Sequence, residues 1–383
     1  MAVFSEKSKT AIDKRLGMLY SIDRVSTLQM RVLTTRGAVT LLELSERKER
    51  ILATVAETYI VSGEPVGSKY LCASAGFRVS SATIRNEMAE LSELGYLEQP
   101  HTSAGRVLSQ KGFRYYVDHL MGRYEPSAVD IFRIRSRVDS NEGDPQKLLS
   151  AAASVLAELT GCAAVVTTPF AAGSRIKRTD LVPLGGRNVM MVVSISNGTL
   201  KSRICRCDRE VSYEMLDLFY KIAASGFADR APDEITTPLV QTVTASLGEK
   251  AFEMTPLLTA FADAAKEAAV TDVLTAGLSN LLRHRDFEGR GAVLQEFLRN
   301  RGNAVRLLRP GSGGQARVIL GTENRCRELM NAAVVCAGYT IADREAGMIG
   351  IVGPMRMDYS AVVPLVQYVA QLIGAMLDEN MSN

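Results

Sequence analysis

The fold of the N-terminal part of the chain is decided by residues 80–95, whose sequence is SSATIRNEMAELSELG. Ser80 is a preferred helix N-cap and Gly95 a preferred residue just beyond a helix end, so this stretch predicts a helix. At about 100° per residue, its large apolar side chains share one side, namely Ile84, Met88 and Leu91. The opposite side carries small and polar residues, which are Ser81, Ala82, Arg85, Asn86 and Ala89. A helix with these two sides is suited to reading base edges in a major groove.

Two helices precede this stretch and a hairpin follows it. Ser45 can cap a first helix that ends at Gly63, and a short second helix comes next. Residues 96–108 predict two short extended pieces around a tip of small residues, and residues 109–121 predict a further helix. Three helices followed by a hairpin predict a winged helix-turn-helix.

Several residues in this region suit contact with duplex DNA. Arg85 can bind guanine O6 and N7, and Asn86 can bind adenine N6 and N7. Ser80 leaves backbone N–H groups at the helix start, where a phosphate can bind. An ordinary solvated helix face is the alternative for Arg85 and Asn86, because Glu87 and Glu90 lie nearby. Basic residues with no acidic neighbour follow, which favours phosphate contact; they are Arg106, Lys111 and Arg114.

Length and composition set the limits of the interpretation. A chain of 383 residues predicts two or three domains. A net charge of +3 is too small to coat nucleic acid, so any DNA contact must be local. The six scattered cysteines predict reduced thiols, and no stretch approaches the roughly 18 apolar residues of a membrane span. We therefore expect a cytoplasmic protein without a membrane partner.

Catalysis and metal binding have little support in the sequence. Cys205 and Cys207 form a C-x-C pair with no histidine near them, which favours free thiols over a zinc site. The chain has three histidines and none of the common catalytic motifs. We therefore expect no enzymatic activity, no cofactor and no metal.

Beyond residue 122 helices and strands alternate. The sequence predicts helices at residues 127–138, 145–160, 325–337 and 359–377. It predicts strands at residues 163–167, 176–184, 189–196, 199–205, 304–308, 316–320 and 346–352. Residues 211–286 have helical spacing with a break at Pro256, among others. Asn197-Gly198 predicts a two-residue hairpin turn with positive φ at both positions. A helical block between strands predicts an insertion in an α+β domain.

Several stretches together resemble the family of the heat-inducible transcription repressor HrcA. They are EPVGS at residues 64–68, SSATIRNEM at 80–88, PHTSAGR at 100–106, GFRYYVD at 112–118, GTEN at 321–324 and GMIGIVGPMRMDY at 347–359. The resemblance runs from about residue 44 to about residue 377 in the family's order. It departs at Leu108, where the family pattern has proline, and this departure concerns the stiffness of the wing.

The resemblance implies an α+β, multidomain protein. Residues 44–122 are expected to form the winged-helix DNA-binding domain. A GAF-like domain is expected in two parts, residues 123–209 and 288–383, with an inserted helical dimerisation domain at residues 210–287. Residues 1–43 lie outside the resemblance, and we expect an N-terminal extension that is poorly ordered; a basic arm and a start codon placed too early are the alternatives.

The resemblance also implies a function. A homodimer would bind double-stranded DNA at an inverted-repeat operator, repress chaperone genes and be kept active by the GroEL chaperonin. The family motif maps DNA reading onto Ser81, Thr83, Arg85 and Asn86, and in the wing onto His101, Thr102, Ser103 and Arg106. For His101 alone, a turn histidine bonded to its own backbone is an alternative. Two other functions stay open: a winged-helix repressor gated by a small-molecule effector in its GAF-like domain, and a protein-interaction module.

Overall fold

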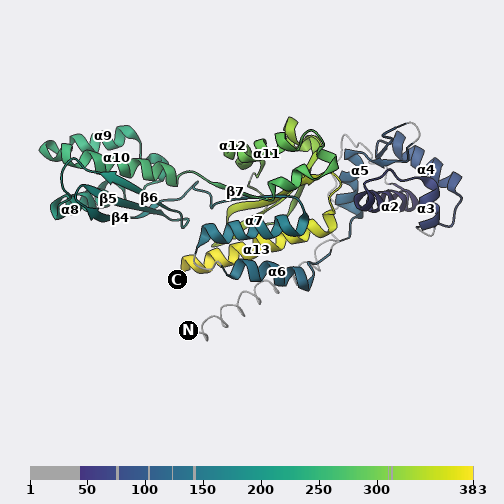
Figure 1. Ribbon diagram of the computed structural model, residues 1–383, viewed down its shortest axis with the longest axis horizontal. Coiled ribbons are helices and arrows are strands. Elements are labelled where there is room, and N and C mark those ends of the chain that lie inside the picture. Colours follow the sequence, from purple (N-terminus) through teal and green to yellow (C-terminus); the bar gives the residue numbers. More distant parts are fainter. Residues whose placement is uncertain are drawn as a thin grey trace, which may run out of the picture.

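The computed structural model describes residues 44–74, 77–101, 104–122, 124–140, 144–308, 310–311 and 314–382. They form three lobes in a row (Figure 1), which we call the N-terminal, central and distal lobes. The N-terminal lobe covers residues 44–122 and the distal lobe residues 176–268; the central lobe is built from the segments on either side of the distal lobe. The predicted extension, residues 1–43, lies outside the described residues.

The N-terminal lobe consists of helices and one small hairpin. Its elements are α2 (Glu46–Ser62), α3 (Ser68–Ser74), α4 (Ser81–Glu93), β1 (Leu97–Glu98), β2 (Val107–Leu108), α5 (Gln110–Tyr115) and the π-helix η1 (Tyr116–Leu120). The side chain of Ser45 caps α2, and Gly63 ends it in the left-handed region with φ 69°. Gly112 lies against the carbonyl of Tyr96 with no room for a Cβ, so the hairpin can pack closely on α5.

A five-stranded antiparallel sheet forms the middle of the central lobe, in the order β7-β3-β10-β9-β8. The strands are β3 (Ala163–Thr167), β7 (Val273–Ala276), β8 (Arg317–Leu320), β9 (Ala332–Ile341) and β10 (Arg344–Pro354). Alternate residues face opposite sides, as a pleated strand requires. Ala333 and Val335 of β9 join one buried cluster, while Val334 and Cys336 join another.

Helices cover both faces of this sheet (Figure 1). On one face lie α6 (Ala128–Asp139), α7 (Pro145–Thr160) and α13 (Tyr359–Ser382). On the other lie η5 (Leu278–Leu282), η6 (Arg285–Phe287), α11 (Gly291–Arg299) and α12 (Arg301–Leu307). By length and composition α13 could also cross a membrane, but 61% of its most apolar window is buried inside the protein. It is therefore the main core helix of this lobe.

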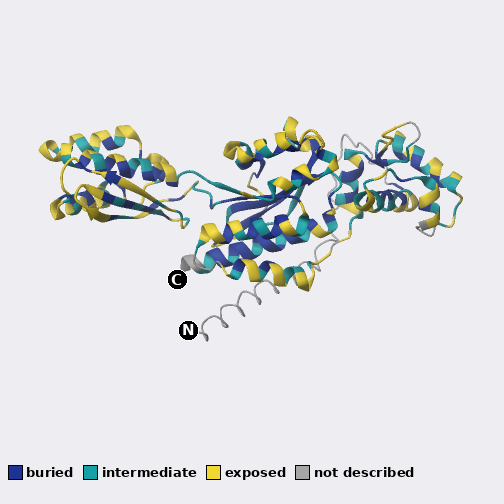
Figure 2. Cartoon of the chain, viewed as in Figure 1, coloured by how far each residue is buried: buried dark blue, intermediate teal, exposed yellow. Residues whose placement is uncertain are grey.

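The distal lobe has its own core. Its strands β4 (Ile176–Gly185), β5 (Asn188–Ile195) and β6 (Leu200–Arg206) form an antiparallel sheet. Its helices are α8 (Tyr213–Ile222), η2 (Ala223–Phe227), η3 (Pro232–Glu234), α9 (Thr237–Ala245), η4 (Gly248–Lys250) and α10 (Ala251–Ala268). Phe261 lies at the centre of this core, with its ring 4.8 Å from that of Phe227 and 6.1 Å from that of Phe219. Figure 2 shows exposed residues along the side of the sheet away from the helices.

The distal lobe corrects the domain boundaries expected from the sequence. Strands β4 to β6 were expected in the first GAF-like part, residues 123–209, yet they share one core with α8 and α10. The inner face of β5 is apolar and is covered by these helices, which explains the association. At the other end, β7 falls inside the expected insertion, residues 210–287, but it pairs with β3 of the central sheet. The inserted unit therefore contains a sheet and ends before β7.

Three predictions of secondary structure are wrong. Residues 304–308 were expected as a strand but belong largely to α12, because the side chain of Asn300 caps that helix and Ala304 and Leu307 share its buried side. Residues 325–337 were expected as a helix but contain η8 (Arg327–Leu329) and the start of β9, after η7 (Gly321–Asn324). A strand buried on both faces has a continuous apolar sequence, which periodicity does not distinguish from a helix. Pro256 lies inside α10 and does not end it.

The hairpin turns also differ from expectation. At the β5–β6 turn only Gly198 has positive φ, because the side chain of Asn197 bonds to the carbonyls of Pro169 and Phe170. The mirror-image geometry occurs instead between β9 and β10, where Ala342 and Asp343 have φ of 48° and 59°. Asp343 is typical of such a turn but Ala342 is not, so the pair is a weaker sequence signal than Asn-Gly.

Candidate nucleic-acid interface

Helix α4 buries one side and exposes the other, as its sequence predicts. Ile84 and Leu91 are fully buried within the N-terminal lobe. Arg85 and Asn86 are exposed on the opposite side. Neither of these two side chains forms a hydrogen bond or an ion pair with any residue that the structure describes. Their polar groups are therefore available to an external partner.

Two of the three acidic residues of α4, Glu87 and Glu90, are bound by helix α2. Glu87 lies 3.2 Å from Arg47 Nε and 3.3 Å from Lys48 Nζ. Glu90 lies 2.8 Å from Lys48 Nζ. Lys48 donates hydrogen bonds to both carboxylates, and these raise its pKa above the ordinary value. The bond to Glu90 contributes more than the bond to Glu87. The carboxylates therefore face α2, which weakens the alternative in which they dominate a solvated face around Arg85.

The start of α4 keeps unused backbone donors. Ser80 Oγ accepts a hydrogen bond from Thr83 N at 3.2 Å and lies 3.0 Å from Thr83 Oγ1. The two hydroxyls are thus tied to each other. The N–H groups of Ser81 and Ala82, in the first turn, have no acceptor within the helix. They add the positive end of the helix dipole to the candidate interface.

The hairpin places one candidate at its tip and one at its base. His101 is exposed, and its carbonyl accepts a hydrogen bond from Ala104 N at 2.8 Å. Arg106 is half-buried, and its Nε donates to Ser92 Oγ at 3.0 Å. The backbone of Arg106 also pairs with Val66, so this arginine holds the hairpin against the helices. Thr102 and Ser103 lie outside the described residues.

The structure assigns Lys111 and Arg114 to other contacts. Lys111 Nζ donates to the carbonyl of Leu94 at 2.8 Å and lies 4.3 Å from the ring centroid of Tyr96. Arg114 Nη1 donates to the carbonyl of Val318 at 2.9 Å and lies 3.2 Å from Glu323. Lys111 therefore closes the end of α4, while Arg114 joins the N-terminal lobe to β8. We remove Arg114 from the candidate interface.

The role of Lys111 gives a prediction. Lys111→Met should lower the free energy of unfolding of the N-terminal lobe by about 1 kcal/mol, because a hydrogen bond and a cation–π contact are lost. The salt dependence of DNA binding should stay unchanged in titrations at several salt concentrations. If the slope of log affinity against log salt concentration fell by about one unit, Lys111 would be a phosphate contact after all.

Two further basic residues were missed by the sequence reasoning. Lys69 lies near the start of α3 and Arg78 in the turn before α4. Both are exposed and have no partner among the described residues. In a helix-turn-helix the first helix crosses the DNA backbone, so these positions suit phosphate contact. The signal was present in the sequence as basic residues on both sides of the turn.

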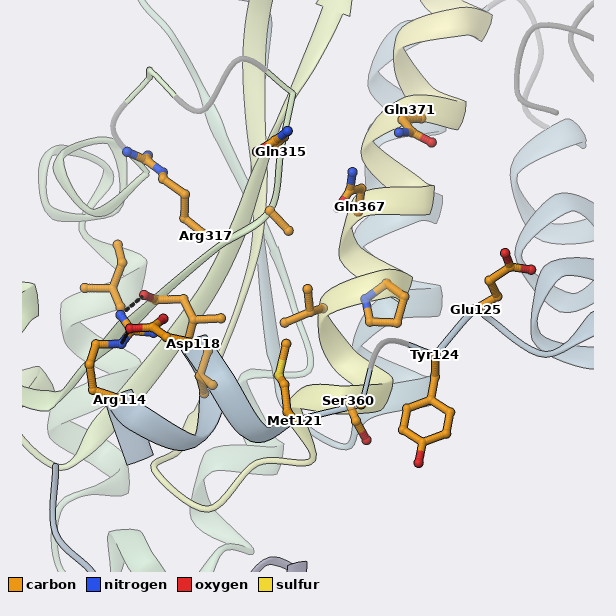
Figure 3. Close-up of a pocket in the computed structure, with 17 residues that line it drawn as sticks. Arg114, Asp118, Met121, Tyr124, Glu125, Gln315, Arg317, Ser360, Gln367 and Gln371 are labelled. Atoms are coloured by element: carbon orange, nitrogen blue, oxygen red, sulfur yellow. Dashed lines mark hydrogen bonds and ion pairs between the residues drawn. The ribbon is translucent and has the colours of Figure 1, made fainter. Parts of the chain in front are cut away.

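A cavity of about 810 Å³ lies where the N-terminal and central lobes meet (Figure 3). Asp118 and Met121 line it from the N-terminal lobe, Gln315 from the segment before β8, and Gln367 and Gln371 from α13. Gln371 Oε1 is buried and has no hydrogen-bond partner in the described part of the chain. The cavity thus combines amide groups with apolar walls.

The same joint is held by direct contacts between the lobes. Gln110 Nε2 donates to Thr322 Oγ1 at 2.9 Å, and Thr322 N donates to Gln110 Oε1 at 3.1 Å. The ring of Phe113 packs edge-on against that of Tyr359, with 6.3 Å between centroids. These contacts set the orientation of the N-terminal lobe on the central lobe.

The cysteines are buried or half-buried thiols. Burial raises the pKa of Cys205 to about 11 and also raises that of Cys207. Both side chains therefore stay protonated near neutral pH, which disfavours reaction as thiolates.

Comparison with known proteins gives one consistent result. The family described as "HrcA protein C terminal domain" matches residues 146–363. The heat-inducible transcription repressor HrcA of Acetivibrio thermocellus is 31% identical over 329 residues, covering 85% of this chain and 94% of that protein. The repressor of the same name from Xylella fastidiosa strain M23 is 33% identical over 342 residues, covering 88% and 96%.

A solved structure supports the arrangement of the elements. A crystal structure titled as that of a hypothetical protein at 2.2 Å resolution has a TM-score of 0.61 to this chain. It covers 88% of this chain and 100% of its own chain at 21% sequence identity. At this identity the similarity concerns the fold alone.

Proposed function

This chain belongs to the HrcA family of heat-inducible transcription repressors, and from this premise we propose that it is a sequence-specific DNA-binding repressor of heat-shock chaperone genes. The observation that carries the proposal is the unpaired Arg85–Asn86 surface of α4. Small residues at Ala82 and Ala89 let this surface approach a groove closely. The family's members are named as repressors, and no catalytic function is proposed.

In this proposal the N-terminal lobe is a winged helix and the central lobe a GAF-like domain. Helix α4 enters the major groove, where Arg85 and Asn86 read bases. The start of α4 binds a phosphate, with Lys69 and Arg78 as further phosphate contacts. The β1–β2 hairpin is the wing, and its proposed contacts are His101, Thr102, Ser103 and Arg106.

We further propose a homodimer formed through the distal lobe. The open face of its sheet carries an apolar row, in which Val182 of β4, Met190 of β5 and Ile204 of β6 lie side by side across the strands. Val182 and Ile204 are 42% and 66% exposed. An inverted-repeat operator requires two reading helices related by two-fold symmetry, so a second copy of this chain is the proposed occupant of this face.

The regulatory part of the proposal rests on the family resemblance. Bound repressor would exclude the transcription machinery, and the GroEL chaperonin would keep the repressor folded. During heat shock unfolded proteins would occupy the chaperonin, and the active fraction of repressor would fall. A loss of one or two kcal/mol of net stability is enough to change this fraction several-fold. The proposed location is the cytoplasm.

Selection of bound sequences from a random duplex library with the purified full-length protein tests the proposal. We expect an inverted repeat to be enriched and to shift in a mobility assay ahead of bulk genomic fragments. Absence of any preference for a palindrome at moderate ionic strength would contradict the DNA-reading role of α4. The same result would favour a protein-interaction module.

The cavity at the lobe joint favours a second candidate function, a repressor gated by a small-molecule effector. The unpaired Gln371 Oε1 offers an acceptor to a ligand, and Asp118 connects the cavity to Arg114 at the joint. The site lies between the lobes and not inside the GAF-like domain. A thermal-shift screen with metabolites, without chaperonin, tests it: saturable stabilisation coupled to operator release would favour this function.

A further inference from the structure

Residues 283–290 form a compact turn, which we call the basic turn. Phe287 N donates to the carbonyl of His284 at 3.0 Å, Glu288 N to that of Arg285 at 3.1 Å, and Arg290 N to that of Phe287 at 2.8 Å. Each of these bonds closes a four-residue turn, whose ends lie within about 7 Å of each other. Three exposed arginines lie within this segment of eight residues; they are Arg283, Arg285 and Arg290.

The positive charge of the basic turn is not balanced within the described part of the chain. None of the three arginines has an ion-pair or side-chain hydrogen-bond partner there. Asp286 points inward, with its carboxylate 2.9 and 3.1 Å from Arg356 Nε. Glu288 is the one exposed carboxylate of the turn. Three cations against one anion repel one another, and a polyanion relieves that repulsion.

The basic turn is connected to the end of α2 in the N-terminal lobe through Arg356. Arg356, the partner of Asp286, also donates through Nη1 to the carbonyl of Ile60 at 3.4 Å. Its guanidinium lies against Gly63, where an added Cβ would be 3.1 Å from Arg356 Cζ. Three residues further along, Val66 pairs with Arg106 of the hairpin.

The position of helix α11 shows where the basic turn lies on the central sheet. Helix α11 begins directly after the basic turn. In Figure 1 α11 lies on the side of the central lobe opposite α6, α7 and α13. The basic turn therefore lies on the face of the central sheet that α6, α7 and α13 leave open, and Phe287 anchors it to the core there.

We propose that Arg283, Arg285 and Arg290 bind the phosphate backbone of duplex DNA that flanks the operator half-site. The inference extends the proposed function and rests on it. Guanidinium groups bind phosphate through paired N–H donors, and such contacts hold the duplex without reading its sequence. The central lobe then contributes to affinity, while α4 supplies specificity.

The test compares two duplexes that share one operator and differ in their flanks. One is trimmed to the selected inverted repeat, and the other extends by about two helical turns, ~20 bp, on each side. The full-length triple variant R283A/R285A/R290A is titrated on both at several salt concentrations. Removed phosphate contacts should lower the salt slope on the long duplex by about one unit per contact and leave the trimmed duplex unaffected.

A matched variant removes the same charge elsewhere. Arg187, Arg230 and Lys266 are exposed in the distal lobe, so R187A/R230A/K266A controls for net charge. The proposal would be overturned if the arginine variant and this control had the same salt slope on the long duplex. It would also be overturned if the arginine variant lost the same affinity for both duplexes. If the wild-type protein preferred no palindrome, that result would instead contradict the proposed function, whatever the titrations of the arginine variant show.

Discussion

Arg85→Ala is expected to weaken operator binding by the dimer about 30-fold to 10⁴-fold. One lost bidentate contact to a base costs about 1–3 kcal/mol, and two-fold symmetry loses it twice. Each 1.4 kcal/mol corresponds to about tenfold in Kd. Affinity for random DNA should change little, because base contacts supply discrimination. The structure supports this result since Arg85 is exposed and has no partner among the described residues.

The matched control is Arg78→Ala, which removes the same side-chain type from the turn before α4. As a proposed phosphate contact, Arg78 should matter equally for operator and random DNA, and its loss should lower the salt slope by about one unit per contact. Titration of both variants on both duplexes distinguishes the roles. If Arg85→Ala weakened operator and random DNA to the same extent, Arg85 would be a phosphate contact.

The double variant V182D/I204D is expected to separate the dimer and to lower operator affinity by about 10²–10⁴-fold through lost bivalency. Both residues lie on the open face of the distal sheet, one on each side of Met190. In a two-fold interface each substitution occurs in both protomers, so four carboxylates would replace apolar contacts and have to be desolvated, which is strongly unfavourable. Analytical ultracentrifugation gives the mass, and titration of a single half-site should show intact monomer binding.

Tyr213→Asp is the control for this variant. Tyr213 is 92% exposed and begins α8, which packs on the other face of the sheet. It should leave the dimer intact. Melting temperatures of all variants should match the wild type at low concentration, because the substituted side chains are exposed in one protomer. A V182D/I204D protein that stayed dimeric would place the interface on another surface.

Local features of the fold could be predicted from the sequence because their causes are local. Ser45 and Ser80 cap helices through bonds to residues three positions away, and Gly63 adopts the left-handed conformation that ends α2. The apolar side of α4 follows from helical spacing alone. For the same reason the exposure of Arg85 and Asn86 could be predicted correctly.

Predictions failed where the deciding contacts are distant in sequence. Strand β9 is apolar on both sides because helices from different parts of the chain cover each face, and periodicity carries no trace of this. Strand β7 forms only through pairing with β3. The turn at Ala342 is held in part by its N–H donating to Asp378, which no neighbouring residue predicts.

Residue type and helical spacing are enough to identify which side chains could read DNA and on which helix face they lie. Which basic residues are free to do so depends on long-range contacts in the folded chain. Arg114 is bound to β8, about two hundred positions away in the chain, while Asp286 is turned toward Arg356 and leaves Arg285 exposed. The physical reason is that helix faces and caps depend on neighbours within a few residues, whereas the pairing of a charge depends on which distant groups the folded chain brings within about 4 Å.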